Sequence, residues 1–328
     1  MIDDIIAQIN SANSIVVIQA DNPDGDSLGS ALALEYILSD LGKEVSLWCG
    51  VDIPDYLKHL EGWSRVSKEL PPKFDLSIIV DTSALSLMEK LETSHNRGWV
   101  STKPVIVIDH HADVECDIPY ATTILNDGNA ISTSQIIYDI AKQAGWNISI
   151  NAGEYIMSAI LADSMGLISE GTTSHTYRIM ADLIDSGVSR TKLEDARKLL
   201  NKMPESIFRY KAKLIDRTEI HADGRLAIVC VPLDEIMEYS PLYNPAALIT
   251  PDLLATEGVL CVVVMKIYKD KITGAIRCNT GGTIAADLAQ NFGGGGHIYA
   301  AGFKIQGAQI SLATTKADVI KIATELLG

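Results

Sequence analysis

The sequence predicts an α/β protein whose N-terminal domain contains a mostly parallel sheet covered by helices on both faces. Over the first 165 residues, short runs rich in valine and isoleucine alternate with segments of helical periodicity. Strands that are buried on both faces need such runs, and strands that alternate with helices form parallel sheets. The length of 328 residues suggests a second domain, because one domain takes roughly 100–200 residues.

The predicted elements of the first domain follow the chain in order. Four segments have the composition of buried strands: Ser14–Gln19, Glu44–Cys49, Leu76–Val80 and Val105–Ile108. Three segments carry apolar residues at helical spacing: Ser27–Leu41, Ile131–Ala144 and Ala152–Leu161.

The pattern then becomes helical and afterwards returns to α/β. Helices are predicted at Tyr177–Ser186, Lys192–Asn201 and Pro204–Arg217. The last part predicts three strands and two helices, at Leu226–Val231, Gly258–Ile267, Thr273–Cys278, Ile284–Asn291 and Lys316–Leu327. We therefore expect a first domain over residues 1–190, a helical connector over 191–217 and a smaller α/β domain over 218–328.

Composition excludes several classes of protein. There are 42 acidic and 27 basic residues, a net charge of −15, and the basic residues are dispersed, so we expect no binding to long duplex nucleic acid. No apolar run approaches the roughly 18–20 residues of a membrane span, and no membrane partner is expected. The first ten residues contain two aspartates where a secretory signal would carry basic residues, which predicts a cytoplasmic protein. The five cysteines are scattered without a CxxC pair, so neither a disulfide framework nor a structural zinc site is predicted.

Acidic and imidazole side chains follow the predicted strands. DNPDGD follows the first strand, Asp81 the third and Asp109-His110-His111 the fourth, while Asp163 ends a predicted helix. In open α/β sheets ligands bind beyond the carboxyl ends of the strands, so these side chains should converge. A plain turn remains the alternative for DNPDGD, and a capping role for Asp81.

Carboxylates gathered in this way would repel one another unless cations lie among them. Oxygen and imidazole ligands suit Mn²⁺, Mg²⁺ or Zn²⁺. Two such ions about 3.5–4 Å apart can clamp a phosphoryl group and lower the pKa of a bound water. The sequence therefore predicts a divalent metal centre that acts on a phosphate.

A run of four glycines precedes His297 near the C-terminus. Glycine accepts positive φ and leaves its backbone N–H groups accessible, so such a loop can surround an anion, with His297 as a further donor. A flexible turn is the alternative.

Five motifs in this order resemble those of the DHH phosphoesterase superfamily, and within it the group of nano-RNases and 3′-phosphoadenosine-5′-phosphate phosphatases. Together they cover nearly the whole chain, and five in order are far more specific than any one alone. The motifs are NPDGDSLGS (Asn22–Ser30), IIVDTS (Ile78–Ser83), VIDHH (Val107–His111), ILADSMG (Ile160–Gly166) and GGGGHIYAAG (Gly293–Gly302).

The resemblance implies a role for each of these polar residues. His111, with Asp109 of the same triplet, would lie close to the phosphate and support catalysis. The metal ions would be Mn²⁺, with Mg²⁺ or another divalent ion as alternatives, and a water activated by them would be the nucleophile. The implied ligands are Asp24 for the first ion, Asp81 as a bridge, and Asp26, His110 and Asp163 for the second.

The first motif departs from the superfamily at one position. A histidine normally stands four residues before its first aspartate, where this chain has Ala20. Alanine offers no ligand atom, and the neighbouring Asp21 should point to the other side of an extended segment. The departure implies a weakened first site filled by water, a second ion brought by the substrate, or a catalytically impaired protein.

In the last domain the resemblance implies a DHH-associated domain that binds the nucleotide end of the substrate. Arg277 corresponds to an arginine that members of the superfamily use on a substrate phosphate. Gly294, Gly295, Gly296 and His297 would form the binding loop, with the substrate expected between the two domains.

The activity implied is metal-dependent hydrolysis of short oligoribonucleotides, of 3′-phosphoadenosine-5′-phosphate, or of both. The alternatives are an impaired nucleotide-binding homologue, an inorganic pyrophosphatase and a cyclic-dinucleotide phosphodiesterase. Members of the superfamily often pair as homodimers, which the sequence leaves open.

Overall fold

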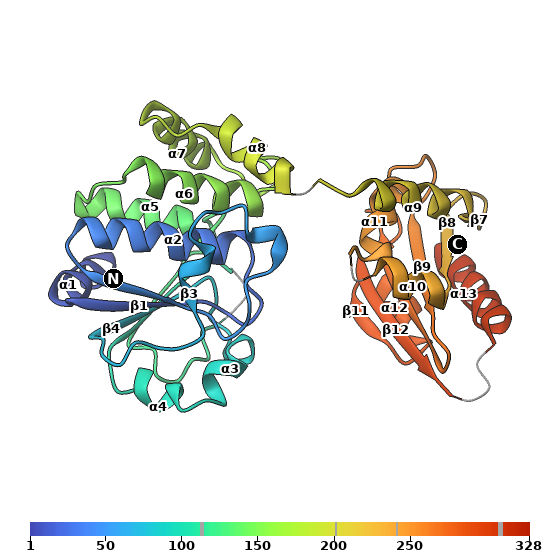
Figure 1. The fold of residues 1–328 in the computed structure, drawn as a ribbon, viewed down its shortest axis with the longest axis horizontal. Coiled ribbons are helices and arrows are strands. Elements are labelled where there is room, and N and C mark those ends of the chain that lie inside the picture. The colour runs from blue at the N-terminus through green and yellow to red at the C-terminus, as the bar shows by residue number, and fades with distance from the viewer. Residues whose placement is uncertain (112–114, 201, 241, 308–310) are drawn as a thin grey trace. The chain divides into compact units, whose positions relative to one another are not determined.

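Two six-stranded sheets organise the chain in the computed structural model (Figure 1), which describes residues 1–111, 115–200, 202–240, 242–307 and 311–328. The chain divides into two compact units, Met1–Lys202 and Met203–Gly328. The helices of the predicted connector are divided between them, since α8 (Arg190–Leu200) belongs to the first unit and α9 (Glu205–Asp216) to the second.

The first unit contains seven further α-helices, six strands and three short 3₁₀-helices among its described residues. The strands are β1 (Ser14–Ile18), β2 (Glu44–Trp48), β3 (Val66–Ser67), β4 (Leu76–Val80), β5 (Val105–Asp109) and β6 (Thr123–Asn126). The helices are α1 (Ile2–Ser11), α2 (Gly25–Asp40), α3 (Glu89–Glu92), α4 (Asn96–Val100), α5 (Thr133–Ala144), α6 (Ile150–Asp163) and α7 (Ser174–Asp185), with η1 (Asp55–Leu57), η2 (Trp63–Arg65) and η3 (Leu85–Leu87).

The sheet of the first unit is parallel throughout, in the strand order β3-β2-β1-β4-β5-β6. This confirms the predicted fold class. The edge strands β3 and β6 were not predicted, because an edge strand is partly exposed and lacks the continuous apolar run of the inner strands.

Helices cover both faces of this sheet (Figure 1). On one face, Val17 and Ile78 pack in a core with α1, α2, α5 and α6. On the other face, Val16 and Ile79 pack with side chains from η3, α3 and α4. The valine and isoleucine runs are therefore buried on both sides, as the sequence predicts.

Helices α2 and α6 approach closely at Gly29, and this approach makes Gly29→Ala a test of the packing. A Cβ at this position would lie 2.9 Å from Ala159 Cβ and 3.0 Å from the Tyr155 carbonyl oxygen. We expect Gly29→Ala to lower the free energy of unfolding by about 1–3 kcal/mol, because the helices must move apart. Urea unfolding followed by tryptophan fluorescence measures this in the first unit, which holds all four tryptophans.

Gly98→Ala in α4 is the matched control. Gly98 has open space at its Cβ position within a helix, so the substitution should leave the stability unchanged or raise it by up to about 1 kcal/mol. Equal stability of Gly29→Ala and the wild type would contradict the close packing of α2 on α6.

The second unit continues after α9 with six strands and four helices among its described residues. The strands are β7 (Glu219–His221), β8 (Leu226–Val231), β9 (Cys261–Ile267), β10 (Lys271–Cys278), β11 (Gly295–His297) and β12 (Ala300–Gln306). The helices are α10 (Leu233–Tyr239), α11 (Pro245–Leu254), α12 (Ala285–Gln290) and α13 (Leu312–Leu327).

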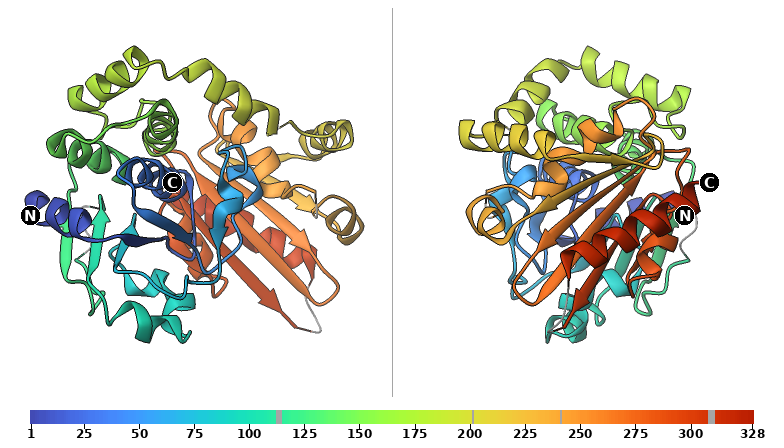
Figure 2. Two further views of the ribbon diagram at one scale, coloured as in Figure 1. Left: turned by 60° about the vertical axis from the view of Figure 1, so that its left-hand side comes forward. Right: turned by 90° about the vertical axis from the view of Figure 1, so that its right-hand side faces the viewer.

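These strands form a mixed sheet in the order β11-β12-β10-β9-β8-β7, in which β8 and β9 are parallel and the other neighbours antiparallel. Helices α12 and α13 cover one face, and α9, α10 and α11 cover β8 and β9 on the other. In both views of Figure 2 the red helix α13 lies against the strands of this sheet.

Within the described ranges, no helix has the length and apolar character needed to cross a membrane. All five cysteines are free thiols.

Candidate metal centre

The first motif, DNPDGD, both starts helix α2 and supplies carboxylates to the site. Asp24 is the N-cap of α2: its carboxylate accepts hydrogen bonds of 3.0 Å from the backbone N–H groups of Asp26 and Ser27, and its own N–H donates to the Ser27 hydroxyl. This capping box fixes the direction in which the helix leaves β1. It also turns the next carboxylate, that of Asp26, into the interior, where the residue is fully buried.

The carboxylate of Asp26, a residue of α2, lies against the N-terminus of helix α5. Its carboxylate accepts hydrogen bonds from the backbone N–H groups of Thr133, at 2.6 Å, and Ser134, at 3.1 Å. The Ser30 hydroxyl donates a third bond at 3.1 Å. The exposed N–H groups and the dipole of a helix N-terminus stabilise a negative charge at this point.

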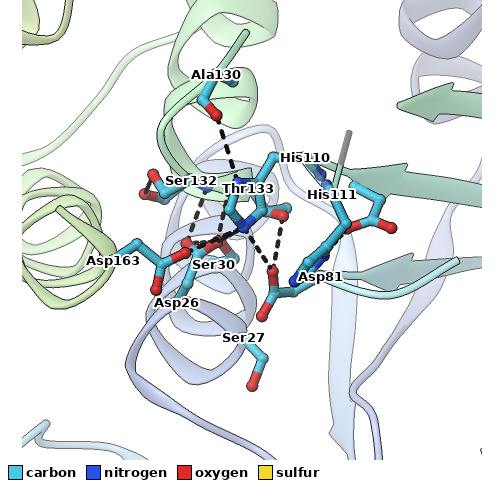
Figure 3. A network of polar contacts seen from close by, with 12 residues as sticks. Asp26, Ser27, Ser30, Asp81, His110, His111, Ala130, Ser132, Thr133 and Asp163 are labelled. Atoms are coloured by element: carbon cyan, nitrogen blue, oxygen red, sulfur yellow. Dashed lines mark hydrogen bonds and ion pairs between the residues drawn. The ribbon is translucent and has the colours of Figure 1, made fainter. Parts of the chain in front are cut away.

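Three carboxylates surround one imidazole nitrogen at the carboxyl edge of the sheet (Figure 3). His110 Nε2 lies 3.0 Å from Asp163 Oδ2, 3.5 Å from Asp81 Oδ1 and 3.7 Å from Asp26 Oδ2. The other ring nitrogen, Nδ1, lies 3.4 Å from the Ala130 carbonyl oxygen. A proton on Nδ1 would leave Nε2 free to bind a metal ion.

Asp81 follows β4 in a left-handed conformation, with φ 63°. Its N–H donates to the Ile108 carbonyl at 2.9 Å, and the Thr133 hydroxyl donates to its Oδ1 at 3.1 Å. Residues other than glycine are strained at this φ, although aspartate tolerates it better than most residues do. In this conformation the Asp81 carboxylate lies 3.5 Å from His110 Nε2.

The pKa values show that the carboxylates repel one another. Burial, together with the charge of Asp163, raises the pKa of Asp26 to about 6. Burial and the charges of Asp26 and Asp24 raise the pKa of Asp81 well above its usual value. Burial alone would lower the pKa of His110, but its hydrogen bond with Asp163 and the charge of Asp26 raise it to about 8. A cation among these groups would relieve the repulsion.

The donor set fits a divalent metal ion. One group of candidate ligands comprises Asp26, His110 and Asp163. A second comprises Asp81, His110 and His111, and within each group the ligand atoms lie within 4.8 Å of one another. Carboxylate oxygens with imidazole nitrogens are ligands that Mn²⁺, Mg²⁺ and Zn²⁺ accept.

Asp109 supports both histidines that follow it. Its side chain is fully buried, and its Oδ1 accepts the His110 backbone N–H at 2.8 Å and lies 2.7 Å from His111 Nδ1. Burial alone would raise the pKa of Asp109, but hydrogen bonds from His111 and Ser83 hold it below its usual value. The same contact with Asp109 raises the pKa of His111, whose side chain is half exposed.

The region around Ala20 differs from the rest of the cluster. Ala20 is buried. Asp24 belongs to neither group of candidate ligands among the described residues, although its charge contributes to the raised pKa of Asp81. The Asp21 carboxylate accepts a hydrogen bond of 2.8 Å from the backbone N–H of Lys90, which lies outside the acidic cluster.

Sequence reasoning missed the residues that bind Asp26 and Asp81 from α5. Thr133 and Ser134 bind Asp26 through backbone N–H groups, which carry no residue signature, and the Thr133 hydroxyl binds Asp81. The available signal was the string Ser132-Thr133-Ser134 before an apolar helix, which is typical of a helix start: Ser132 caps α5 by accepting the Gln135 N–H.

In the second unit, Arg277 and His297 lie on the same face of the sheet. Each is paired with Ala300 of β12, which lies between their strands, and directly paired residues point to one face. Both side chains are exposed, and Arg277 donates to the Ile276 carbonyl at 2.8 Å. The next row on this face, Ala275, Gly302 and Gly295, is made of small residues.

The glycines of the run differ in what requires them. A Cβ at Gly294 would lie 2.2 Å from the Gly302 carbonyl oxygen, and one at Gly296, where φ is 142°, 2.5 Å from the Ala300 carbonyl oxygen. Both are therefore needed for the close approach of β11 to β12. Gly295 has open space at its Cβ position and leaves the surface bare beside His297.

Comparisons with known proteins agree with this geometry. The model of the DHH family, N-terminal domain, matches residues 14–165. The bifunctional oligoribonuclease and PAP phosphatase NrnA of Thermus thermophilus is 27% identical over 299 residues, covering 89% of this chain and 84% of that protein. The crystal structure of an exopolyphosphatase-related protein from Bacteroides fragilis has a TM-score of 0.79 at 21% identity, covering 99% of this chain and 97% of that chain. Exonuclease RecJ bound to manganese has a TM-score of 0.51 at 16% identity, covering 98% of this chain and 94% of that chain.

These structural similarities concern the fold. The family match spans the strands and helices that carry every residue of the acidic cluster, from Asp24 to Asp163. Residues 14–165 form a DHH family N-terminal domain, and over most of its length the chain is similar to a protein named as a bifunctional oligoribonuclease and PAP phosphatase.

Proposed function

We propose that the protein is a metal-dependent phosphoesterase that hydrolyses short oligoribonucleotides and 3′-phosphoadenosine-5′-phosphate. The observation that carries this proposal is the convergence of Asp26, Asp81 and Asp163 on one imidazole nitrogen of His110. The name of the Thermus thermophilus relative supports the choice of substrates. Mn²⁺ is the proposed ion, supported by the manganese in exonuclease RecJ, with Mg²⁺ as the alternative.

When bound, the metal ions would activate a water molecule and neutralise charge on the phosphoryl oxygens. Asp26, Asp81, His110 and Asp163 would hold them, and the N-terminus of α5 fixes the orientation of Asp26. Asp109 holds the ring of His111 by its Nδ1 and raises the pKa of that ring. This contact favours the imidazolium form, which can donate to a phosphate oxygen.

The second unit offers cationic and donor groups for the rest of the substrate. Arg277 can hold a second phosphate in bidentate fashion, and His297 lies on the same sheet face with a flat row of small residues beside it. A nucleotide end fits such a surface better than a long polymer does. We propose residues 218–328 as the substrate-binding domain, and the homodimer stays a prediction.

Asp109→Asn tests the positioning role of Asp109. We expect kcat to fall about 10–100-fold with KM and the Mn²⁺ affinity little changed, because the amide cannot keep His111 charged and aligned. Steady-state kinetics and calorimetric titration with Mn²⁺ give these values. Asp127→Asn, on an exposed residue that follows β6, is the control and should behave as the wild type. A fall in Mn²⁺ affinity as large as the fall in kcat would instead make Asp109 a determinant of the metal site.

The proposed activity is tested with 5′-labelled RNAs of graded length and with 3′-phosphoadenosine-5′-phosphate. We expect hydrolysis of the shortest RNAs and of the nucleotide with Mn²⁺, a decline with RNA length, and none in excess chelator. Hydrolysis of pyrophosphate alone would contradict the substrate class.

Ala20 favours a second candidate function, that of a nucleotide-binding homologue without catalysis. The two candidates predict different results in the same assay. Tight nucleotide binding without hydrolysis of either substrate would support the second.

A further inference from the structure

A pocket of about 420 Å³ lies directly beside the acidic cluster within the first unit. Gly25, between Asp24 and Asp26, forms part of its wall, as does Ala162, which precedes Asp163. The Tyr56 hydroxyl, on another wall, donates to the Pro23 carbonyl at 3.4 Å. The pocket therefore shares its backbone with the residues that would hold the metal ions.

Four segments of the chain build the pocket. They are the start of α2 at Gly25, the turn around η1, the C-terminal half of α6 with the residues after it, and α8, which contacts α6 (Figure 1). Gly25 cannot carry a side chain here, since a Cβ would lie 2.5 Å from Ala162 Cβ.

The lining is apolar at its base and polar at its rim. Leu57, Leu60 and Leu161 are buried and belong to the core of the first unit, and Leu193 of α8 packs against that core. The rim is formed by Tyr56, His59, Glu194 and Arg197.

The charges at the rim cancel. Arg197 Nη2 lies 2.8 Å from Glu194 Oε2 in an ion pair on one helix. Burial lowers the pKa of His59, which disfavours the charged form of its ring. A cradle for a phosphate would need an excess of positive charge, which this rim lacks.

We propose that this pocket binds the nucleoside portion of a nucleotide whose phosphate lies at the acidic cluster. A volume of this size holds a small organic ligand, since ligand pockets measure about 300–1,000 Å³. The leucines provide an apolar surface for the flat faces of a base. Arg197 and Glu194 offer one donor and one acceptor for its edge, and Tyr56 offers a ring beside the metal centre. The inference rests on the proposed function and assigns the nucleoside to a place in the catalytic unit itself.

Helix α8 should respond to the ligand. None of its described residues is buried, so it is held mainly by Leu193, and a ligand against Arg197 and Leu193 would add contacts.

Calorimetric titration of the full chain with AMP and with inorganic phosphate, both with Mn²⁺, tests the pocket. Ser158→Tyr places a ring in the pocket from α6, and Asn151→Tyr adds the same ring to an exposed position of α6. We expect Ser158→Tyr to weaken the affinity for AMP about tenfold and the affinity for phosphate by less than about twofold. Asn151→Tyr should change neither affinity. Arg197→Gln should weaken the affinity for AMP but not the affinity for phosphate. Lys198→Gln, next to it on α8, should change neither affinity.

Hydrogen exchange gives a second readout. AMP should slow the exchange of the α8 amides, and inorganic phosphate should not. Wild-type affinity of Ser158→Tyr for AMP, or wild-type binding of AMP no tighter than that of phosphate, would overturn the pocket. AMP binding that is lost in Ser158→Tyr, in a wild-type protein that hydrolyses neither substrate with Mn²⁺, would keep the pocket and remove the proposed catalysis.

Discussion

Asp81→Asn is expected to reduce kcat by about 10³-fold or more, equivalent to about 4 kcal/mol of transition-state stabilisation. The charges of Asp26 and Asp24 both raise the pKa of Asp81, and its Oδ1 lies 3.5 Å from His110 Nε2. Asparagine is nearly the same size as aspartate and tolerates the positive φ at this position, so the fold should persist. Activity toward the nucleotide with Mn²⁺ measures the loss.

The same variant should be more stable than the wild type in the absence of metal. A carboxyl whose pKa is raised on folding destabilises the folded state at pH values above that pKa, and the pKa of Asp81 is raised by burial and by its acidic neighbours. Near pH 7.5 the metal-free variant should melt at a higher temperature, by about 2–4 °C for each kcal/mol gained. Mn²⁺ should raise the melting temperature of the wild type far more than that of the variant. Retained activity, or an equal Mn²⁺ effect on both proteins, would remove Asp81 from the metal site.

Ala20→His is expected to increase the affinity for a second Mn²⁺ by about 10–100-fold. The resemblance to the superfamily puts a histidine at this position, and the wild-type chain offers a buried alanine. In the wild type Asp24 caps α2 and belongs to neither group of candidate ligands. The ion that Asp26, His110 and Asp163 would hold therefore has more ligands than the ion near Asp24. Calorimetric titration, with electron paramagnetic resonance of free Mn²⁺, counts the ions.

Ala20→Phe is the control for this change, because it adds a ring of similar size without a ligand atom. It should not gain affinity for Mn²⁺. An equal gain in both variants, or none in Ala20→His, would show that position 20 does not limit the metal site.

Much of the first unit could be predicted because its inner strands are buried on both faces. The runs at Leu76–Val80 and Val105–Ile108 admit few other structures, and the polar residues after them had to meet at one edge of the sheet. The edge strand β6 has no buried residue and the short helix α1 buries only Ile5 and Ile9, so their patterns are weaker.

The site could be predicted only as far as its side chains carry the chemistry. Asp26, Asp81, His110 and Asp163 were identified, and the structure brings them together. Asp24 as a ligand stays a prediction, and its role as the N-cap of α2 could not be told from the sequence, because an aspartate that caps a helix and one that binds a metal look the same there. The N–H groups of Thr133 and Ser134, and the pocket beside Gly25, depend on distant segments meeting in space.

Anomalous scattering from a crystal soaked in Mn²⁺ tests the proposed metal centre. We predict a strong manganese peak within about 2.5 Å of His110 Nε2 and of carboxylate oxygens from Asp26, Asp81 and Asp163, and a weaker second peak toward Asp24. Manganese bound elsewhere, with this cluster empty at saturating Mn²⁺, would contradict it.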